Sequence, residues 1–277
     1  MAETLPSLPI AMTIAGSDSS GGAGIQADLK TFTALGVYGA SVLTALTAQN
    51  TRGVDGVMAV PPAFVTAQLD SVLSDLTVGA TKTGMLANAG IILAVADSLQ
   101  SCPEIPLVCD PVMIATSGDV LLEPDAIDAL RERLIPRAAL ITPNIPEAAR
   151  LLGCEEADDV DEMARQAEAL RSLGCGAVLL KGGHGSGKMA TDLLVHSGGM
   201  TRLEAPRIPT SNTHGTGCTL AAAITALLAA GENLEQAVRR AKTYVWRALE
   251  AGAGLRIGHG SGPVDHLFAI RRQPMPA

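Results

Sequence analysis

The sequence predicts an α/β protein, a three-layer α/β/α arrangement in which a central, mostly parallel β-sheet is flanked by helices on both faces. Short β-branched or aliphatic runs alternate with longer amphipathic segments, as in parallel sheets covered by helices. The run Leu107-Val108-Cys109 is apolar throughout, which is typical of a strand buried on both faces. No Pro-, Gly- or Ser-rich linker and no internal repeat divides the chain, so residues 1–277 are interpreted as one domain. Its ends, 1–8 and 272–277, are expected to be flexible.

The strands are predicted from short aliphatic or β-branched runs that stop at turn-forming residues. In chain order they are Ile10–Ala15, Ser41–Ala48, Val78–Thr83, Leu107–Asp110, Leu140–Thr142 and Ala177–Lys181. Beyond them, residues Val195 to Ile208 are predicted to form shorter strands, next to an exposed glycine-rich loop at Gly182–Lys188.

The helices are predicted from longer segments in which apolar residues recur at helical spacing, as Ala63, Ala67, Leu69 and Leu73 do. In chain order they are Gly24–Leu35, Pro62–Ser74, Ala89–Leu99, Asp125–Leu134, Ile145–Leu152, Val160–Leu173, Thr216–Ala230 and Leu234–Ala251.

Turn-forming and polar residues follow most of the predicted strands. They are Gly16-Ser17-Asp18, Gln49-Asn50-Thr51, Gly84-Met85, Asp110-Pro111, Pro143-Asn144 and Gly182-Gly183. Because ligands of parallel sheets bind beyond the carboxyl ends of the strands, these residues are expected to converge on one crevice.

Composition excludes several classes of function. The formal net charge is -8, aromatic residues make up 2%, and no long basic run is present, so a nucleic-acid partner is not expected. The longest apolar run, Leu220 to Ala230, is too short to span a bilayer, and the first residues do not resemble a signal peptide. The five cysteines show no zinc spacing. A soluble, cytoplasmic protein without membrane contact is therefore expected.

The segment Asn212–Cys218 is a glycine-rich turn that opens the predicted helix Thr216–Ala230. Unpaired backbone N–H groups and the positive end of the helix dipole would meet there, which favours binding of phosphate. Gly215 and Gly217 would let the backbone approach a ligand, and the thiol of Cys218 in the first turn would ionise more easily. The alternative is an ordinary glycine turn before a buried helix, with Cys218 as a small core residue. Taken alone, the segment leaves both interpretations open.

Two further glycine-rich segments are not nucleotide motifs. Gly182–Lys188 fits G-x-x-x-x-G-K, but Met189 stands where a magnesium-binding Ser or Thr is needed. Gly22–Ala27 resembles a dinucleotide turn but lacks the acidic residue at the end of a second strand. Asp28 follows this turn on the apolar side of a helix, which indicates a paired or functional acid, or a partner of the helix dipole.

Four polar residues near strand ends have both a structural and a functional interpretation. Asn144 and Glu147 fit a capping box, although Glu147 could also hold hydrated magnesium near phosphates. Asp110 is either a turn residue or an acid next to metal and phosphate. Lys181 could neutralise a nucleotide phosphate or simply reach solvent. The histidines show no metal spacing.

Together these segments resemble the hydroxymethylpyrimidine/phosphomethylpyrimidine kinases of thiamine biosynthesis, members of the ribokinase-like superfamily. The similarity extends from Ile10 to Phe268 and is carried by Gly16 to Asp28, Ala48 to Gly53, Lys82 to Leu86, Asp110 to Met113, Thr142 to Glu147, Lys181 to His184 and Gly215 to Cys218.

The resemblance implies ATP and Mg²⁺ as cofactors, a small pyrimidine as substrate and a homodimer. It implies that the aminopyrimidine is surrounded by Gly16, Asp28, Gln49, Met85, Val112 and Cys218. It implies an anion hole formed by the amides of Gly215, Thr216, Gly217 and Cys218. It places Lys181, Asn144 and Asp110 at the nucleotide, and Glu147 at the magnesium ion.

The expected reactions convert 4-amino-5-hydroxymethyl-2-methylpyrimidine to its monophosphate and then to its diphosphate. Many sugar kinases of the superfamily have an aspartate base where this chain has Cys218, whose thiolate could take the substrate proton or whose thiol could orient the hydroxyl. A pyridoxal or pyridoxine kinase is the alternative within the superfamily. A silent ligand-binding protein on the same scaffold is the alternative from another class.

Overall fold

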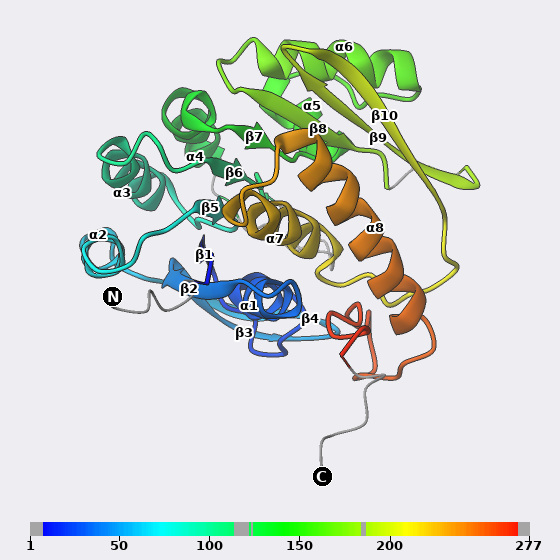
Figure 1. The fold of residues 1–277 in the computed structure, drawn as a ribbon, viewed down its shortest axis with the longest axis horizontal. Helices are drawn as coiled ribbons and strands as arrows, with labels where there is room; N and C mark the ends of the chain where they lie inside the picture. The colour runs from blue at the N-terminus through cyan, green and yellow to red at the C-terminus, as the bar shows by residue number, and fades with distance from the viewer. Residues whose placement is uncertain (1–7, 114–121, 123, 184–186, 271–277) are drawn as a thin grey trace, which may run out of the picture.

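The computed structural model describes residues 8–113, 122, 124–183 and 187–270. The ends expected to be flexible therefore fall outside the description, apart from residue 8. Figure 1 shows a central sheet between two layers of helices, which confirms the predicted α/β class. None of the described helices is both long and apolar enough to cross a membrane.

The main sheet has eight strands in the order β10-β9-β8-β7-β6-β5-β1-β2. Their bounds are β1 (Ile10–Ala15), β2 (Tyr38–Leu43), β5 (Ala80–Thr83), β6 (Leu107–Cys109), β7 (Leu140–Ile141), β8 (Ala177–Lys181), β9 (Met189–His196) and β10 (Gly199–Pro206). All pairs from β2 to β8 are parallel, whereas β9 and β10 extend the sheet in antiparallel fashion. The carboxyl ends of the parallel strands thus share one edge.

The helices are α1 (Gly24–Ala34), α2 (Pro62–Leu73), α3 (Ala89–Gln100), α4 (Pro124–Ala129), α5 (Ile145–Leu152), α6 (Val160–Arg171), α7 (Thr216–Ala229) and α8 (Leu234–Gly252). Helices α1, α7 and α8 cover one face of the sheet, and α2 to α6 cover the other. Helix α7 lies centrally and packs against α1 and α8, which explains its almost continuous run of buried alanine and leucine.

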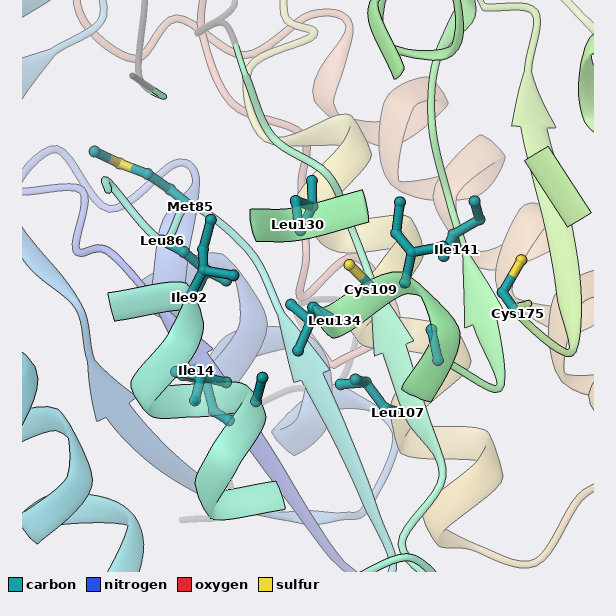
Figure 2. Close-up of a cluster of buried hydrophobic side chains, with 14 of the residues drawn as sticks. Ile14, Met85, Leu86, Ile92, Leu107, Cys109, Leu130, Leu134, Ile141 and Cys175 are labelled. Atoms are coloured by element: carbon teal, nitrogen blue, oxygen red, sulfur yellow. The ribbon is translucent and has the colours of Figure 1, made fainter. Parts of the chain in front are cut away.

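The core follows the alternation of side chains along the strands. Leu107 and Cys109 of β6 join Ile14 and Ile141 on one face (Figure 2), whereas Val108 faces the cluster built with α7 and α8. Both faces of the sheet are therefore buried, as the unbroken apolar run of β6 predicts.

The predicted strand Ser41–Ala48 is wrong in its bounds. The chain leaves the main sheet at Thr44, whose hydroxyl donates to the Met85 carbonyl oxygen at 2.6 Å. It continues as β3 (Ala45–Asn50), which pairs antiparallel with an unpredicted strand, β4 (Gly53–Ala59). Strand β4 is largely exposed and contains two glycines, so it lacks the apolar pattern used to find strands.

Two other segments also differ from prediction. The segment Asp125–Leu134 is not one uniform α-helix, because α4 passes into a π-helical turn over Leu130–Leu134 and then a 3-10 turn. The short strands expected over Val195 to Ile208 are instead a hairpin of two eight-residue strands, β9 and β10. Part of the loop Gly182–Lys188, residues 184–186, lies outside the described residues.

Candidate active site

The mouth of α7 is a set of backbone amides opened by a glycine. Gly215 is the N-cap residue with φ 79°, a left-handed conformation that favours glycine. The amides of Gly217 and Cys218 precede the first α-helical hydrogen bond, from Thr219 N–H to the Gly215 carbonyl at 2.8 Å. We call Gly215–Cys218 the phosphate-binding turn, after the role predicted for it, because the Gly217 and Cys218 amides meet the positive end of the helix dipole there. The Thr216 amide does not fit the predicted anion hole, since it already donates to the Thr213 carbonyl oxygen at 3.2 Å.

The phosphate-binding turn is packed against the β1–α1 loop, residues 16–23, and against Gly24, the first residue of α1. A side chain at Gly215 would overlap the Gly22 carbonyl oxygen. The backbone N–H of Gly24 donates to the sulfur of Cys218. The loop that follows β1 and the mouth of α7 therefore form a single surface.

The thiol of Cys218 does not ionise easily in this environment. Burial raises its pKa to about 11, although the nearby Lys82 ammonium opposes the shift. The expectation of a lowered thiol pKa is therefore wrong, because desolvation outweighs the contributions of the cation and of the Gly24 amide.

Next to the phosphate-binding turn lies a buried ion pair. The ammonium of Lys181 is 3.0 Å from Asp110 Oδ1, which also accepts a hydrogen bond from the Thr142 hydroxyl at 2.9 Å. A Cβ at Gly217 would lie 3.3 Å from Lys181 Nζ and 3.9 Å from Asp110 Oδ2. Asp110 Oδ2 itself is buried without a hydrogen-bond partner. A charged lysine and an unsatisfied carboxylate oxygen thus border the helix mouth.

Asn144 and Glu147 form the predicted capping box at the start of α5. Asn144 Oδ1 accepts from the Glu147 amide and Glu147 Oε2 accepts from the Asn144 amide, each at 2.8 Å. Burial raises the pKa of Glu147 to about 7, with Asp110 adding to the shift and Lys181 opposing it. The cap is confirmed, and a role for Glu147 at magnesium stays a prediction.

Asp28 is fully buried and both of its oxygens are occupied. Lys82 Nζ lies 3.0 Å from Oδ1 and 2.8 Å from Oδ2, and the Thr13 hydroxyl donates to Oδ2 at 2.6 Å. Burial alone would lower the pKa of Lys82, but the Asp28 carboxylate raises it above its ordinary value. The structure thus gives Asp28 an ion-pair role, and a direct bond to substrate stays a prediction.

Three of the other predicted substrate residues, Gly16, Met85 and Val112, follow neighbouring strands of the main sheet, whereas Gln49 lies in β3 of the separate two-stranded sheet. The Gly16 amide donates to the Met85 carbonyl at 3.2 Å, and a Cβ at Gly16 would lie 3.1 Å from Met85 Sδ. Val112 follows Asp110 and packs partly against the core. Gln49, at the end of β3, borders a cavity of about 280 Å³ together with His214 and Arg52.

Sequence reasoning missed three buried partners in this region: Lys82, Asp18 and His214. A lysine within the short β5 run Ala80-Thr81-Lys82-Thr83 could have signalled a buried acid, since unpaired charges are rarely buried. Asp18 Oδ2 lies 2.8 Å from His214 Nε2, a pairing between residues 196 positions apart that no local spacing reveals. Within the described residues, no group of three His, Cys, Asp or Glu side chains forms a metal-binding cluster.

Comparison with known proteins agrees with this geometry. The family model described as phosphomethylpyrimidine kinase matches residues 18–265. The chain is 54% identical over 259 residues to the hydroxymethylpyrimidine/phosphomethylpyrimidine kinase of Escherichia coli (strain K12), covering 94% of this chain and 97% of that one. It is 57% identical over 258 residues to the protein of the same name from Rhizobium meliloti (strain 1021), covering 93% and 97%.

Solved structures resemble the fold over nearly its full length. A Bacillus subtilis pyridoxal kinase in an ADP complex superposes with a TM-score of 0.88 at 38% identity, covering 96% of this chain and 100% of that chain. A phosphomethylpyrimidine kinase from Clostridium difficile 630 superposes with a TM-score of 0.77 at 44% identity, covering 87% and 99%. The fold is therefore ribokinase-like.

Proposed function

The chain belongs to the phosphomethylpyrimidine kinase family, and we propose on that premise how its site carries out the reaction. The reaction is ATP-dependent phosphorylation of 4-amino-5-hydroxymethyl-2-methylpyrimidine to the monophosphate and then to the diphosphate, in thiamine biosynthesis. The observation that carries the proposal is the phosphate-binding turn, which is bordered by Lys181 and Asp110 and ends in the Cys218 thiol.

Positioning and charge stabilisation dominate phosphoryl transfer. The amides of Gly215, Gly217 and Cys218 would hold the oxygens of the transferring group, and the Lys181 ammonium would share their charge. Loss of one well-aimed donor of this type costs about 2.7–4 kcal/mol of barrier. Gly217 matters because a side chain there would occupy the space that the phosphoryl group needs, beside Lys181 and Asp110.

Cys218 is proposed to contact the hydroxyl group that attacks the phosphorus. Since burial raises the pKa of this thiol to about 11, the structure favours a neutral thiol, and we propose that it orients the hydroxyl. In a loose transition state the hydroxyl proton leaves late, so a sulfur that fixes the hydroxyl in line can assist without ionising first. Gln49, with an amide donor and acceptor, is proposed to read the ring amine and nitrogens.

ATP as donor is supported by solved relatives whose complexes contain ADP or AMP-PCP. Mg²⁺ fits the residues present. Asp110 Oδ2 is buried without a hydrogen-bond partner, and the Glu147 carboxyl lies close enough to Asp110 for the charge of Asp110 to raise the pKa of Glu147. Magnesium takes few carboxylates and keeps several waters, so these two acids suffice. When bound, it would neutralise phosphate charge, and Asn144 would hold Glu147 in place.

The second phosphorylation is proposed to use the same pocket. The monophosphate would shift so that its own phosphate oxygen becomes the acceptor beside the phosphate-binding turn. No second catalytic centre is needed for this sequence.

Pyridoxal is the competing substrate, since pyridoxal kinases superpose with a TM-score of 0.88 at 38% and 35% identity. Relatives at 54% and 57% identity carry the pyrimidine kinase name, which favours the pyrimidine. The test offers each compound alone with MgATP and measures ADP release and product mass. The mono- and diphosphate of the pyrimidine are expected. Turnover of pyridoxal without any turnover of the pyrimidine would overturn the assignment.

A homodimer in the cytoplasm is also proposed. Leu46, Val57 and Met58 of the β3–β4 pair are 41%, 48% and 61% exposed, an apolar surface that a second copy could cover. Light scattering of the purified protein tests this assembly, and a monomer mass at micromolar concentration would contradict it.

A further inference from the structure

One side-chain contact between the β1–α1 loop and the residue before the phosphate-binding turn has no role in the proposed chemistry. His214 directly precedes the phosphate-binding turn, and its Nε2 lies 2.8 Å from Asp18 Oδ2 in the β1–α1 loop. Both side chains are almost fully buried, at 9% and 2% exposed. A buried ion or hydrogen-bond pair between distant segments fixes their relative position.

Asp18 organises the β1–α1 loop, because its carboxylate accepts hydrogen bonds from several groups of that loop. Its Oδ1 accepts the amide and hydroxyl of Ser20 at 2.8 and 2.7 Å. Its Oδ2 accepts the amides of Gly22 and Ala23 at 3.0 and 2.8 Å, in addition to His214. Burial opposes ionisation, yet these hydrogen bonds, His214 foremost, hold the pKa of Asp18 well below its ordinary range. The carboxylate is thus ionised and can only accept, so His214 Nε2 carries the proton.

The backbone at either end of this loop also contacts residues proposed to surround the substrate. The amide of Gly24 donates to the Cys218 sulfur, and the Gly16 amide bonds the Met85 carbonyl. A Cβ at Gly22 would overlap the His214 ring, so the loop backbone lies directly on the imidazole. A shift of the Asp18–His214 contact would therefore move the substrate side relative to the phosphate side.

We propose that Asp18 and His214 are positioning residues that hold the phosphate-binding turn in register with the β1–α1 loop. They do not touch the reacting atoms, and they act by setting the distance between the phosphoryl group and the hydroxyl beside Cys218. Because a misplacement of about 1 Å can cost on the order of 100-fold in rate, the pair should influence turnover far more than binding. This inference rests on the proposed kinase function.

The experiment compares His214→Ala, His214→Gln and Asp18→Asn with the parent, using MgATP and the hydroxymethylpyrimidine. His214→Ala is expected to lower kcat on the order of 100-fold and to leave the KM for the pyrimidine within about twofold. His214→Gln, whose amide can still donate to Asp18, is expected to recover kcat to within about threefold of the parent. Asp18→Asn is expected to lower kcat about tenfold with KM unchanged, because the shared acceptor loses its charge.

Ile224→Val, a buried position in the same helix, is the control: it lowers stability while kcat is retained. Equal kcat in His214→Ala and the parent would overturn the proposal, as would equal losses in the Ala and Gln variants. If His214→Ala does not fold, the other two variants test the proposal. Parental kcat in Asp18→Asn, or a tenfold loss of kcat in His214→Gln, would overturn the positioning role. A parent that forms no phosphorylated pyrimidine would instead refute the proposed function.

Discussion

Cys218 occupies a position that a general base or an orienting group could use, and its raised pKa separates the two. A base that must ionise first would be almost entirely protonated at neutral pH when its pKa is about 11. We therefore propose that the sulfur orients the hydroxyl, and that the hydroxyl proton passes to an oxygen of the phosphoryl group as the transfer is completed.

Cys218→Ala should lower kcat by about 100-fold or more and change the KM for the pyrimidine little, because the contact operates on the attacking oxygen. Gln49→Ala, the matched binding variant, should chiefly raise that KM. Steady-state kinetics with saturating MgATP measure both. Unchanged turnover in Cys218→Ala would remove the sulfur from the acceptor position.

Lys82→Met should destabilise the fold by about 3–5 kcal/mol, because it leaves the Asp28 carboxylate buried and unpaired. Adding Asp28→Asn should recover much of this loss, since a neutral amide replaces the uncompensated charge. Urea unfolding at pH 7 measures the free energies of unfolding. Losses that simply add in the double variant would argue that the two side chains are not coupled.

Asp28 also shows what a sequence can and cannot reveal about a single residue. Its place on the apolar side of α1 predicts a paired or functional acid. Its partner depends on the register of β1 with β5, which sets Thr13 opposite Lys82 and brings both to Asp28. Strand register arises from tertiary packing, so the pairing could not be predicted from one chain.

The mouth of α7 contains two glycines with different physical tasks. Gly215 has φ 79° and its missing side chain leaves room for the Gly22 carbonyl, whereas Gly217 borders only the end of Lys181 and a carboxylate oxygen. Glycine is required at position 215 by the backbone conformation, and we expect it to be required at position 217 by the bound phosphate.

Gly215→Ala should therefore lose more than about 1 kcal/mol of stability through backbone strain and overlap. Gly217→Ala should retain the parental melting temperature but lose at least tenfold in kcat, because its methyl group enters the phosphate site. Thermal unfolding and kinetics of the two variants distinguish these effects. A Gly217→Ala variant with parental kcat would show that the phosphoryl group does not approach this position.

The segment after α8 is anchored to α7 through His266. Thr219 donates its hydroxyl to the Gly215 carbonyl at 2.7 Å, so at 3.0 Å it accepts from His266 Nε2. Burial lowers the pKa of His266 to about 4. The folded protein thus favours the neutral ring.

Stability from His266 should be fully present above pH 6.5 and lost as the pH falls toward 4, because the unfolded chain binds the proton more readily. The loss should approach about 3 kcal/mol at and below pH 4. His266→Asn, which does not titrate, should show a shallower decline between pH 6.5 and 4 in urea unfolding. Parallel declines in variant and parent would contradict the buried neutral imidazole.

Among the elements, apolar periodicity located those that bury a full face and failed for those that do not. Strands β1 and β8 have the predicted bounds, because both lie inside the sheet. Strand β4 was missed because most of it is exposed, and the π-helical turn at Leu130–Leu134 has no sequence signature distinct from an α-helix. Apolar periodicity indicates which residues are buried, and it indicates helix or strand only where one face of the element is buried.

For the molecule as a whole, the predicted convergence of strand ends is confirmed for β1, β5, β6, β7 and β8, since parallel pairing brings their carboxyl ends to one edge. The order of the strands and the antiparallel β9–β10 edge could not be predicted, because nothing local specifies a neighbour. The topology does not determine the roles of the site residues either, since these depend on where substrate and nucleotide bind.

The most direct test is a crystal structure with Mg²⁺, a non-hydrolysable ATP analogue and the hydroxymethylpyrimidine bound together. We expect γ-phosphate oxygens within hydrogen-bonding distance of the Gly217 and Cys218 amides, with the pyrimidine hydroxyl between that phosphate and the Cys218 sulfur. A γ-phosphate bound away from the mouth of α7, or a pyrimidine whose hydroxyl points away from Cys218, would contradict it.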